Sequence, residues 1–193
     1  MARSIQDYPG TAGPEPEPET YTISVIVELP NSIFDTGHAA LCMANGKVYS
    51  YGDYTEGMFI VYDSLQKYLD DRNNNRDKYT FTISLDRDDY MALYDYYQDE
   101  LWQYAEQNCV GNYTAYKLNG GNYQKFDIFT NNCTTLVYRA LSKTSLNISA
   151  PWISTPGGLY DYFTSPLYKF YNKNMPVTKK QVGYYKRPLI FIC

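Results

Sequence analysis

The sequence predicts an α+β domain, and three observations lead to this fold class. Apolar and polar residues alternate over residues 21–29 and 79–85, as they do in strands with one buried face. The pair Asn45-Gly46 separates two short apolar runs, which is a strong signal for a β-hairpin. Apolar residues recur at steps of three and four between residues 86 and 107, which predicts a helix. Because the predicted strands come mostly before the predicted helices, the pattern favours α+β over alternating α/β.

Length and composition indicate one domain, over residues 21–193, behind a tail of residues 1–20. The chain has 193 residues, of which 44% are hydrophobic, enough for one sizeable core. Residues 11–20 are rich in Pro and Glu and have little apolar surface to bury, so we expect an extended tail. The net charge of −4 argues against binding to nucleic acid or to an anionic membrane through bulk charge.

The chain shows neither a signal peptide nor a membrane span. Its first ten residues have no apolar core, so we expect a protein made in the cytoplasm without a signal peptide. No stretch approaches the ~20 apolar residues of a membrane helix, so no integral membrane segment is predicted.

In the first half of the chain the predicted elements are strands. The strand over 21–29 ends at Pro30, and the hairpin pairs residues 38–44 with residues 47–51. Residues 70–77 are polar throughout, which predicts an exposed loop before the strand at 79–85.

The second half contains the predicted helices. Acidic residues in the first turn suit the start of the helix over 86–107, and Gly111 lies just beyond its end. A loop is predicted over 111–124, a second helix over 134–141, a short helix over 155–163 and a final strand over 189–193.

Cys133 is the leading candidate nucleophile, because the sequence places it at the start of the second helix. Asn132 is a good capping residue, and the apolar positions that follow define the helix. Unpaired N–H groups and the helix dipole are expected to stabilise a thiolate and lower its pKa. The same N–H groups could bind the oxyanion formed when a thiolate attacks a carbonyl. The simpler interpretation is a buried, inert cysteine.

The other three cysteines are weaker candidates. Cys109 is predicted at the C-terminal end of the long helix, where the dipole disfavours a thiolate. Cys42 lies on one strand with His38 but ~13 Å away, and Cys193 is the last residue. The spacing of the four cysteines fits no zinc site, while a disulfide of Cys133 or Cys109 stays open.

His38 is the only histidine, so a thiol that needs an imidazole base must use it. Gly37 precedes it, and a glycine there allows another chain segment to approach closely.

The segment from Gly37 to Ser50, with Asn132-Cys133 heading a helix 95 residues after the histidine, resembles a known superfamily. It is similar to the circularly permuted NlpC-type branch of the papain-like cysteine hydrolases. That branch includes lecithin:retinol acyltransferase-like enzymes, bacterial cell-wall amidases and toxin domains. The resemblance covers roughly residues 21–163. It implies an antiparallel sheet packed on helices, with the catalytic cysteine at a helix N-terminus and no cofactor or metal.

The resemblance implies Cys133 as nucleophile, His38 as general base and then acid, and a polar third member on the next strand. The family position falls on Ser50. A plain two-residue turn at Asn45-Gly46 would instead place Asp53 opposite His38, whereas one extra bulged residue would put Ser50 on the face of His38. A carboxylate would stabilise an imidazolium better than a hydroxyl, so Ser50 and Asp53 are alternatives.

The expected function is therefore that of a cysteine amidase or peptidase. The resemblance suggests peptidoglycan peptides as substrate. It also suggests a toxin-like effector, delivered by a secretion machine into another cell's periplasm and opposed by an immunity or inhibitor protein. Two alternatives stay open: a lipid acyl hydrolase or acyltransferase of the same fold, and a catalytically silent binding module. The module would use the 23 tyrosines, most of which are expected simply to pack their rings.

Overall fold

The structure is a computed structural model. It describes residues 20–32, 35–52, 59–72, 75–102, 104–110, 113–118, 131–148 and 154–183. The predicted tail, apart from Thr20, and the predicted strand over 189–193 lie outside these residues, as does Asp53.

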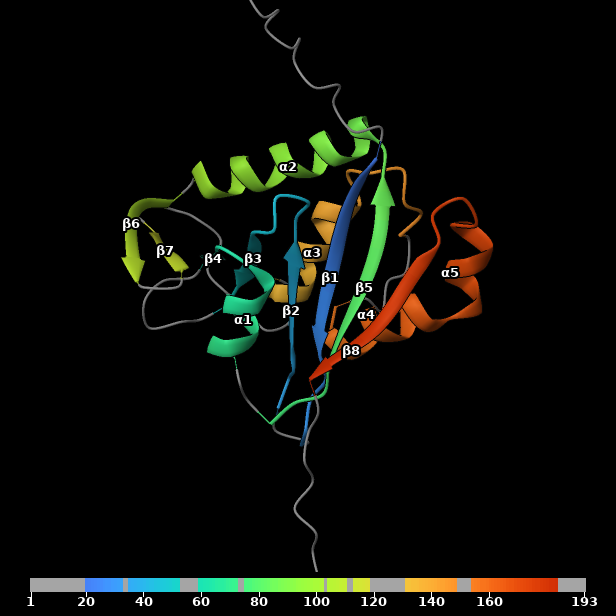
Figure 1. Cartoon of the computed structure of the whole chain (residues 1–193), viewed down its shortest axis with the longest axis horizontal. Coiled ribbons are helices and arrows are strands. Elements are labelled where there is room, and N and C mark those ends of the chain that lie inside the picture. The colour runs from blue at the N-terminus through green and yellow to red at the C-terminus, as the bar shows by residue number, and fades with distance from the viewer. Residues whose placement is uncertain are drawn as a thin grey trace, which may run out of the picture.

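Within these residues the centre of the fold is one eight-stranded sheet, in the order β6-β7-β4-β3-β2-β1-β5-β8 (Figure 1). Every pairing between neighbours is antiparallel. The strands are β1 (Tyr21–Glu28), β2 (His38–Cys42), β3 (Val48–Tyr51), β4 (Phe59–Tyr62), β5 (Lys78–Leu85), β6 (Tyr104–Val110), β7 (Tyr113–Leu118) and β8 (Val177–Gly183).

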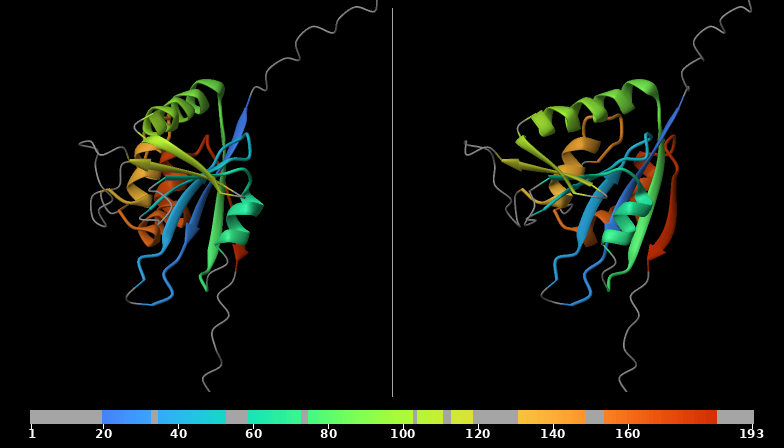
Figure 2. Two further views of the ribbon diagram at one scale, coloured as in Figure 1. Left: turned by 90° about the vertical axis from the view of Figure 1, so that its left-hand side faces the viewer. Right: turned by 60° about the vertical axis from the view of Figure 1, so that its left-hand side comes forward.

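Helices cover both faces of this sheet (Figure 2). They are α1 (Leu65–Asp71), α2 (Arg87–Trp102), α3 (Cys133–Leu141), α4 (Pro156–Thr164) and α5 (Pro166–Tyr171). The larger apolar core joins one face of the sheet to side chains of α2, α3 and α4. A smaller core on the opposite face contains Ile26, Ala40 and Tyr68, the last of which comes from α1. The two faces therefore differ, and we name them the α3 face and the α1 face.

The α+β class is confirmed, and several elements agree with the sequence pattern. β1 and β5 follow the alternation over 21–29 and 79–85, and β2 and β3 form the predicted hairpin. Helix α3 begins at Cys133, as the capping residues before it indicate. Helix α4 matches the short helix predicted over 155–163.

The helix predicted over 86–107 is too long. Helix α2 ends at Trp102, and residues 104–110 form β6, which pairs with β7. Cys109 therefore lies in a strand and not at the C-terminal end of a helix. The loop predicted over 111–124 is also wrong in part, because residues 113–118 are β7. Pairing between these strands decides the outcome, since strand formation depends more on neighbours than on local propensity.

The prediction of an exposed loop over 70–77 is confirmed only in part, because Asp70 and Asp71 belong to α1 and Arg72 and Arg76 are half-buried. This polar run contains Arg72 and Arg76, whose guanidinium groups reach the buried carboxylate of Glu28. The sequence pattern also missed β4, α1, α5 and β8, which are short or lack a clean apolar period.

The hairpin register shows which of the two turn geometries Asn45-Gly46 adopts, a plain two-residue turn or a turn with one extra residue. Met43 N–H donates to Lys47 O, and Gly46, with φ 82°, occupies the left-handed position of a three-residue loop. Ala40 consequently pairs with Ser50. The turn thus has the extra residue, and Ser50 lies on the same face of the sheet as His38.

Gly37 packs its backbone against β1, as a glycine before the strand allows. Its φ is 72°, and a Cβ built on it would lie 2.5 Å from the carbonyl oxygen of Glu28. No rotamer relieves that contact, because both groups are backbone.

We predict that Gly37→Ala costs about 3 kcal/mol or more of unfolding free energy, because it adds a steric clash to left-handed strain. Gly46→Ala is the matched control, since Gly46 has a similar φ of 82° and no atom within 4 Å of the added Cβ. It should cost about 1–2 kcal/mol. Urea denaturation measures both variants, and equal losses would contradict the close approach at Gly37.

Candidate active site

The N-terminus of α3 is built by a complete capping box. The side-chain oxygen of Asn132 accepts hydrogen bonds from Thr134 N–H and Thr135 N–H, both at 2.9 Å. In return, Asn132 N–H donates to Thr135 Oγ1 at 2.8 Å, and Asn132 Nδ2 donates to Ser154 O. Cys133 is thus the first residue of a firmly fixed helix.

This cap corrects the expected oxyanion site. The N–H groups of Thr134 and Thr135 already bind Asn132, so they do not serve an incoming oxyanion. The capping box leaves the Cys133 N–H outside its own hydrogen bonds.

The Cys133 thiol is buried, and its polar neighbours are Ala39 N–H and Thr134. The residue is 7% exposed and belongs to the core on the α3 face. Burial raises the pKa of the Cys133 thiol, although hydrogen bonds from Ala39 N–H and from Thr134 act in the opposite direction. The expectation of a lowered pKa is therefore wrong, because burial outweighs the helix terminus. The resting group is a thiol.

His38 and Ser50 are in direct contact across the hairpin. His38 Nε2 lies 2.8 Å from Ser50 Oγ, and both residues are buried. Two features bring them together: the bulged turn, which sets the register, and the strand alternation that follows from it.

The structure brings Cys133 to the residue next to His38. The thiol accepts from Ala39 N–H, and Ala39 belongs to the core on the α3 face. His38 has the parity of Ala40, whose side chain lies on the α1 face, and so its side chain starts toward Ser50 and Glu28. The Cys133 thiol and the His38 imidazole therefore approach the start of β2 from opposite faces of the sheet, and the structure does not bring the two side chains into contact.

A buried cluster of charged groups surrounds the same end of β2. Glu28 is the pairing partner of His38 on β1, and its side chain is fully buried. Its carboxylate accepts from Tyr68 OH at 2.9 Å, from Arg72 Nε at 2.9 Å and from Arg76 Nη1 at 3.1 Å. We call Glu28, Tyr68, Arg72 and Arg76 the Glu28 cluster.

Asp35 extends the Glu28 cluster to the residue before His38. Its carboxylate accepts from Gly37 N–H at 2.9 Å and forms an ion pair with Arg76. Burial alone would raise the pKa of Asp35, but these donors and Asn31 N–H lower it. Charged side chains from β1, from the C-cap of α1 and from two loops therefore fix the chain entering β2.

His38 is held in its neutral form. The pKa of His38 is lowered to about 3, mainly by burial. The positive charges of Arg72 and Arg76 also lower it, and together they outweigh the opposite effect of the Glu28 carboxylate. A neutral imidazole at pH 7 can accept a proton, which is what a general base must do. The candidate pair therefore rests as thiol and imidazole and not as thiolate and imidazolium.

We predict that the single histidine does not titrate between pH 8 and pH 5. Its Hε1 resonance, followed by NMR, should keep the chemical shift of a neutral ring across that range. The pKa of His38 is lower in the folded state than the ordinary value of 6.5. Between pH 6.5 and pH 3 the unfolded chain therefore binds a proton that the folded protein does not, so the free energy of unfolding falls as the pH is lowered through this range. A midpoint near 6.5 in folded protein would contradict a buried, neutral His38.

The remaining predicted groups lie elsewhere. Asp53 is outside the described residues. Cys42 is half-buried near the hairpin turn, its thiol 3.7 Å from both Met43 O and Gly46 O, and Cys133 is free of any disulfide. In the described parts of the chain no three His, Cys, Asp or Glu side chains are grouped so as to hold a metal ion.

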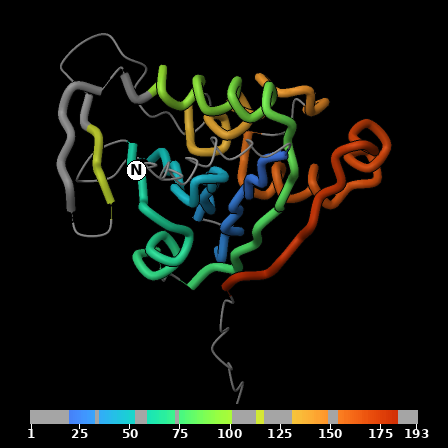
Figure 3. Tube along the Cα trace, turned by 45° about the horizontal axis from the view of Figure 1, so that its top comes forward, coloured from blue at the N-terminus to red at the C-terminus, as the bar shows by residue number. Residues whose placement is uncertain are grey.

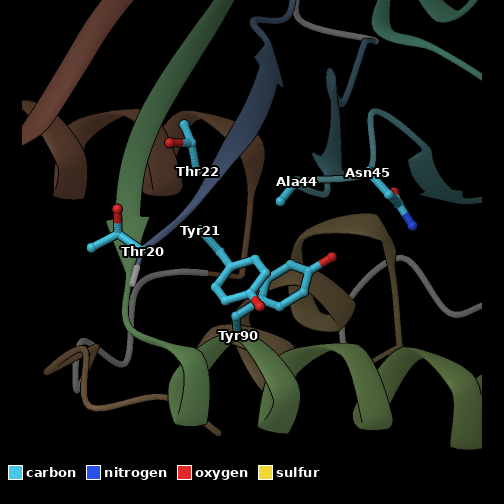
Figure 4. A pocket seen from close by; sticks show the side chains of 6 residues that line it. All are labelled: Thr20, Tyr21, Thr22, Ala44, Asn45 and Tyr90. Atoms are coloured by element: carbon cyan, nitrogen blue, oxygen red, sulfur yellow. The ribbon is translucent and has the colours of Figure 1, made fainter. Parts of the chain in front are cut away.

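A separate pocket lies at the other end of β1 (Figure 4). Tyr21 and Tyr90 stack there with ring centroids 4.3 Å apart. Tyr21 begins β1 and Glu28 ends it, so this pocket is distinct from the site at Cys133 and His38. Its lining residues are Thr20, Tyr21, Thr22, Ala44, Asn45 and Tyr90.

No family model, curated protein or solved structure matches this chain. None of the helices in the described ranges is both long enough and apolar enough to span a bilayer. Function must therefore be argued from the chemistry of the side chains around Cys133 and His38.

Proposed function

We propose that the protein is a cysteine hydrolase that cleaves amide bonds through Cys133 and His38. The observation that carries the proposal is the placement of the Cys133 thiol, at the start of a capped helix, against the backbone of Ala39, the residue next to the only histidine. The hydrogen bond between His38 Nε2 and Ser50 Oγ supports it, because a base must be oriented by a third group.

In the proposed reaction, His38 takes the thiol proton as Cys133 attacks the substrate carbonyl. The step uses the tautomer in which Nε2–H donates to Ser50 Oγ, so that Nδ1 takes the proton. The C–N bond then breaks, the proton passes from His38 to the leaving amine, and the acyl group stays on sulfur as a thioester. Water, deprotonated by His38, attacks the thioester, releases the acid and returns the thiol.

The environment of both groups suits general-base activation of a thiol. Neither carries a charge at rest, because burial raises the pKa of Cys133 and lowers that of His38. The reaction needs the imidazole to come within hydrogen-bonding distance of the thiol. His38 is buried on the α1 face in contact with Ser50, so this step requires its imidazole to turn toward the α3 face.

The Cys133 amide is the proposed oxyanion donor, since the cap engages the next two N–H groups. Peptides of peptidoglycan are the proposed substrate, on the resemblance described above. An effector that acts in another cell's periplasm, opposed by an immunity protein, is the corresponding biological role.

Incubation with purified peptidoglycan, with synthetic stem peptides and with phospholipid vesicles tests the proposal. The expected result is release of new amines from the peptide substrates, with the Cys133→Ala variant as the blank. Release of fatty acid without amine would favour the lipid acyl hydrolase. Equal amine release by both proteins, or no turnover of any substrate, would overturn the proposal.

A further inference from the structure

Helix α5 exposes an unusual amount of apolar surface. Among the described residues four large apolar side chains are exposed, and three of them belong to α5: Leu167 at 49%, Phe170 at 73% and Tyr171 at 55%. The rings of Phe170 and Tyr171 contact each other edge to face, with centroids 5.1 Å apart. Apolar groups concentrated in this way indicate an interaction site.

Helix α5 lies at the outer edge of the fold beside β8 (Figures 1 and 3), and we call α5 together with Lys173 the tip. It is nevertheless rigidly attached. Tyr168 is buried and its hydroxyl donates to Met175 O at 2.8 Å. Asn172 is also buried, donates to Tyr162 OH at 3.0 Å and accepts from Asn147 N–H at 2.8 Å. Binding through this tip costs little ordering entropy.

The tip carries positive charge in a chain that is acidic overall. The described residues 162–183 contain four Lys and no Asp or Glu, although the chain as a whole has 17 basic and 21 acidic residues. Lys169 and Lys173 lie in and directly after α5, and both are exposed.

We propose that α5 docks the protein onto an anionic lipid bilayer. Leu167, Phe170 and Tyr171 enter the boundary between headgroups and acyl chains, and Lys169 and Lys173 bind lipid phosphates. This proposal goes beyond the hydrolase and does not depend on it.

Charge and composition both favour a bilayer over other partners. The tip combines apolar and cationic side chains, which suits the headgroup boundary of an anionic bilayer, whereas an exposed leucine gains nothing from nucleic acid. The acidic remainder of the chain would repel a polyanion that wraps the protein, whereas a flat anionic surface contacts only the tip. The net charge of −4 therefore excludes binding through bulk charge but not through this local patch.

Flotation with vesicles tests the proposal, using phosphatidylcholine alone or with 30% phosphatidylglycerol at 50 and 300 mM salt. The full chain should bind the anionic vesicles, and more weakly at high salt. Phe170→Ala should lower the partition coefficient about tenfold, and Lys169→Gln and Lys173→Gln about fivefold each. Met91→Ala is the control, because Met91 is 40% exposed on α2, near acidic residues, and should bind like the wild type.

Three outcomes would overturn the proposal: no binding of the wild type to anionic vesicles, unchanged binding by Phe170→Ala, or an equal loss in Met91→Ala. Binding to a single-stranded oligonucleotide without binding to vesicles would assign the tip to nucleic acid instead. None of these results depends on hydrolysis, so the docking surface and the proposed enzyme can fail separately.

Discussion

Replacing Cys133 with alanine is expected to abolish amide hydrolysis, with a loss in kcat of at least ~1000-fold. The proposed reaction forms a bond between the substrate acyl group and Cys133 Sγ, and alanine has no atom that replaces it. The rate of amine release from the best peptide substrate measures this, and intact mass spectrometry should detect the acyl adduct on the wild type alone. The fold should survive, because removing one buried sulfur costs about 1 kcal/mol.

Cys42→Ala is the matched control for that experiment. Cys42 is also a free cysteine, and burial raises the pKa of its thiol to about 11. It lies near the hairpin turn, at the end of β2 opposite His38. We expect wild-type turnover from this variant. If Cys133→Ala turned over peptide as fast as Cys42→Ala, the sulfur of Cys133 would have no part in the reaction.

Replacing Glu28 with glutamine is expected to cost about 3–5 kcal/mol of unfolding free energy. The substitution keeps the shape but removes the charge that two arginines share. Arg72 and Arg76 are only 15% and 20% exposed, so water compensates them poorly. Asp35 still pairs with Arg76 in this variant.

Urea denaturation of Asp63→Asn provides the control. Asp63 forms an ion pair with Lys67 at 2.6 Å, but both side chains are well exposed, so the substitution should change stability by less than ~1 kcal/mol. Similar losses in the two variants would contradict the view that burial makes the Glu28 cluster important.

The site could be predicted from the sequence as far as local signals reach. Asn132 before an apolar helical period marks the start of α3, and Asn45-Gly46 marks the hairpin. The choice between Ser50 and Asp53 depended on one residue in that turn, which dipeptide composition does not specify. The register gives Ser50 the face of His38, while Asp53 remains outside the described residues.

What the sequence could not reveal depends on contacts between distant segments. The thiol pKa is set by how deeply α3 packs on the sheet, and a helix terminus alone predicts the opposite direction. Arg72 and Arg76 stand in a run that resembles a solvated loop, and only Glu28, 44 and 48 residues away, explains them. An acidic residue closing an otherwise apolar strand was the available signal, since a buried carboxylate needs partners.

The position of β8 at the end of the strand order has a consequence for solubility. Among the described strands its single neighbour is β5, so its outer backbone groups form a margin to which a foreign strand could add. Lys179 and Lys180 are both exposed on this strand. Adding a second copy there would bring like charges together and strip water from them, which discourages fibril-like stacking of sheets between molecules.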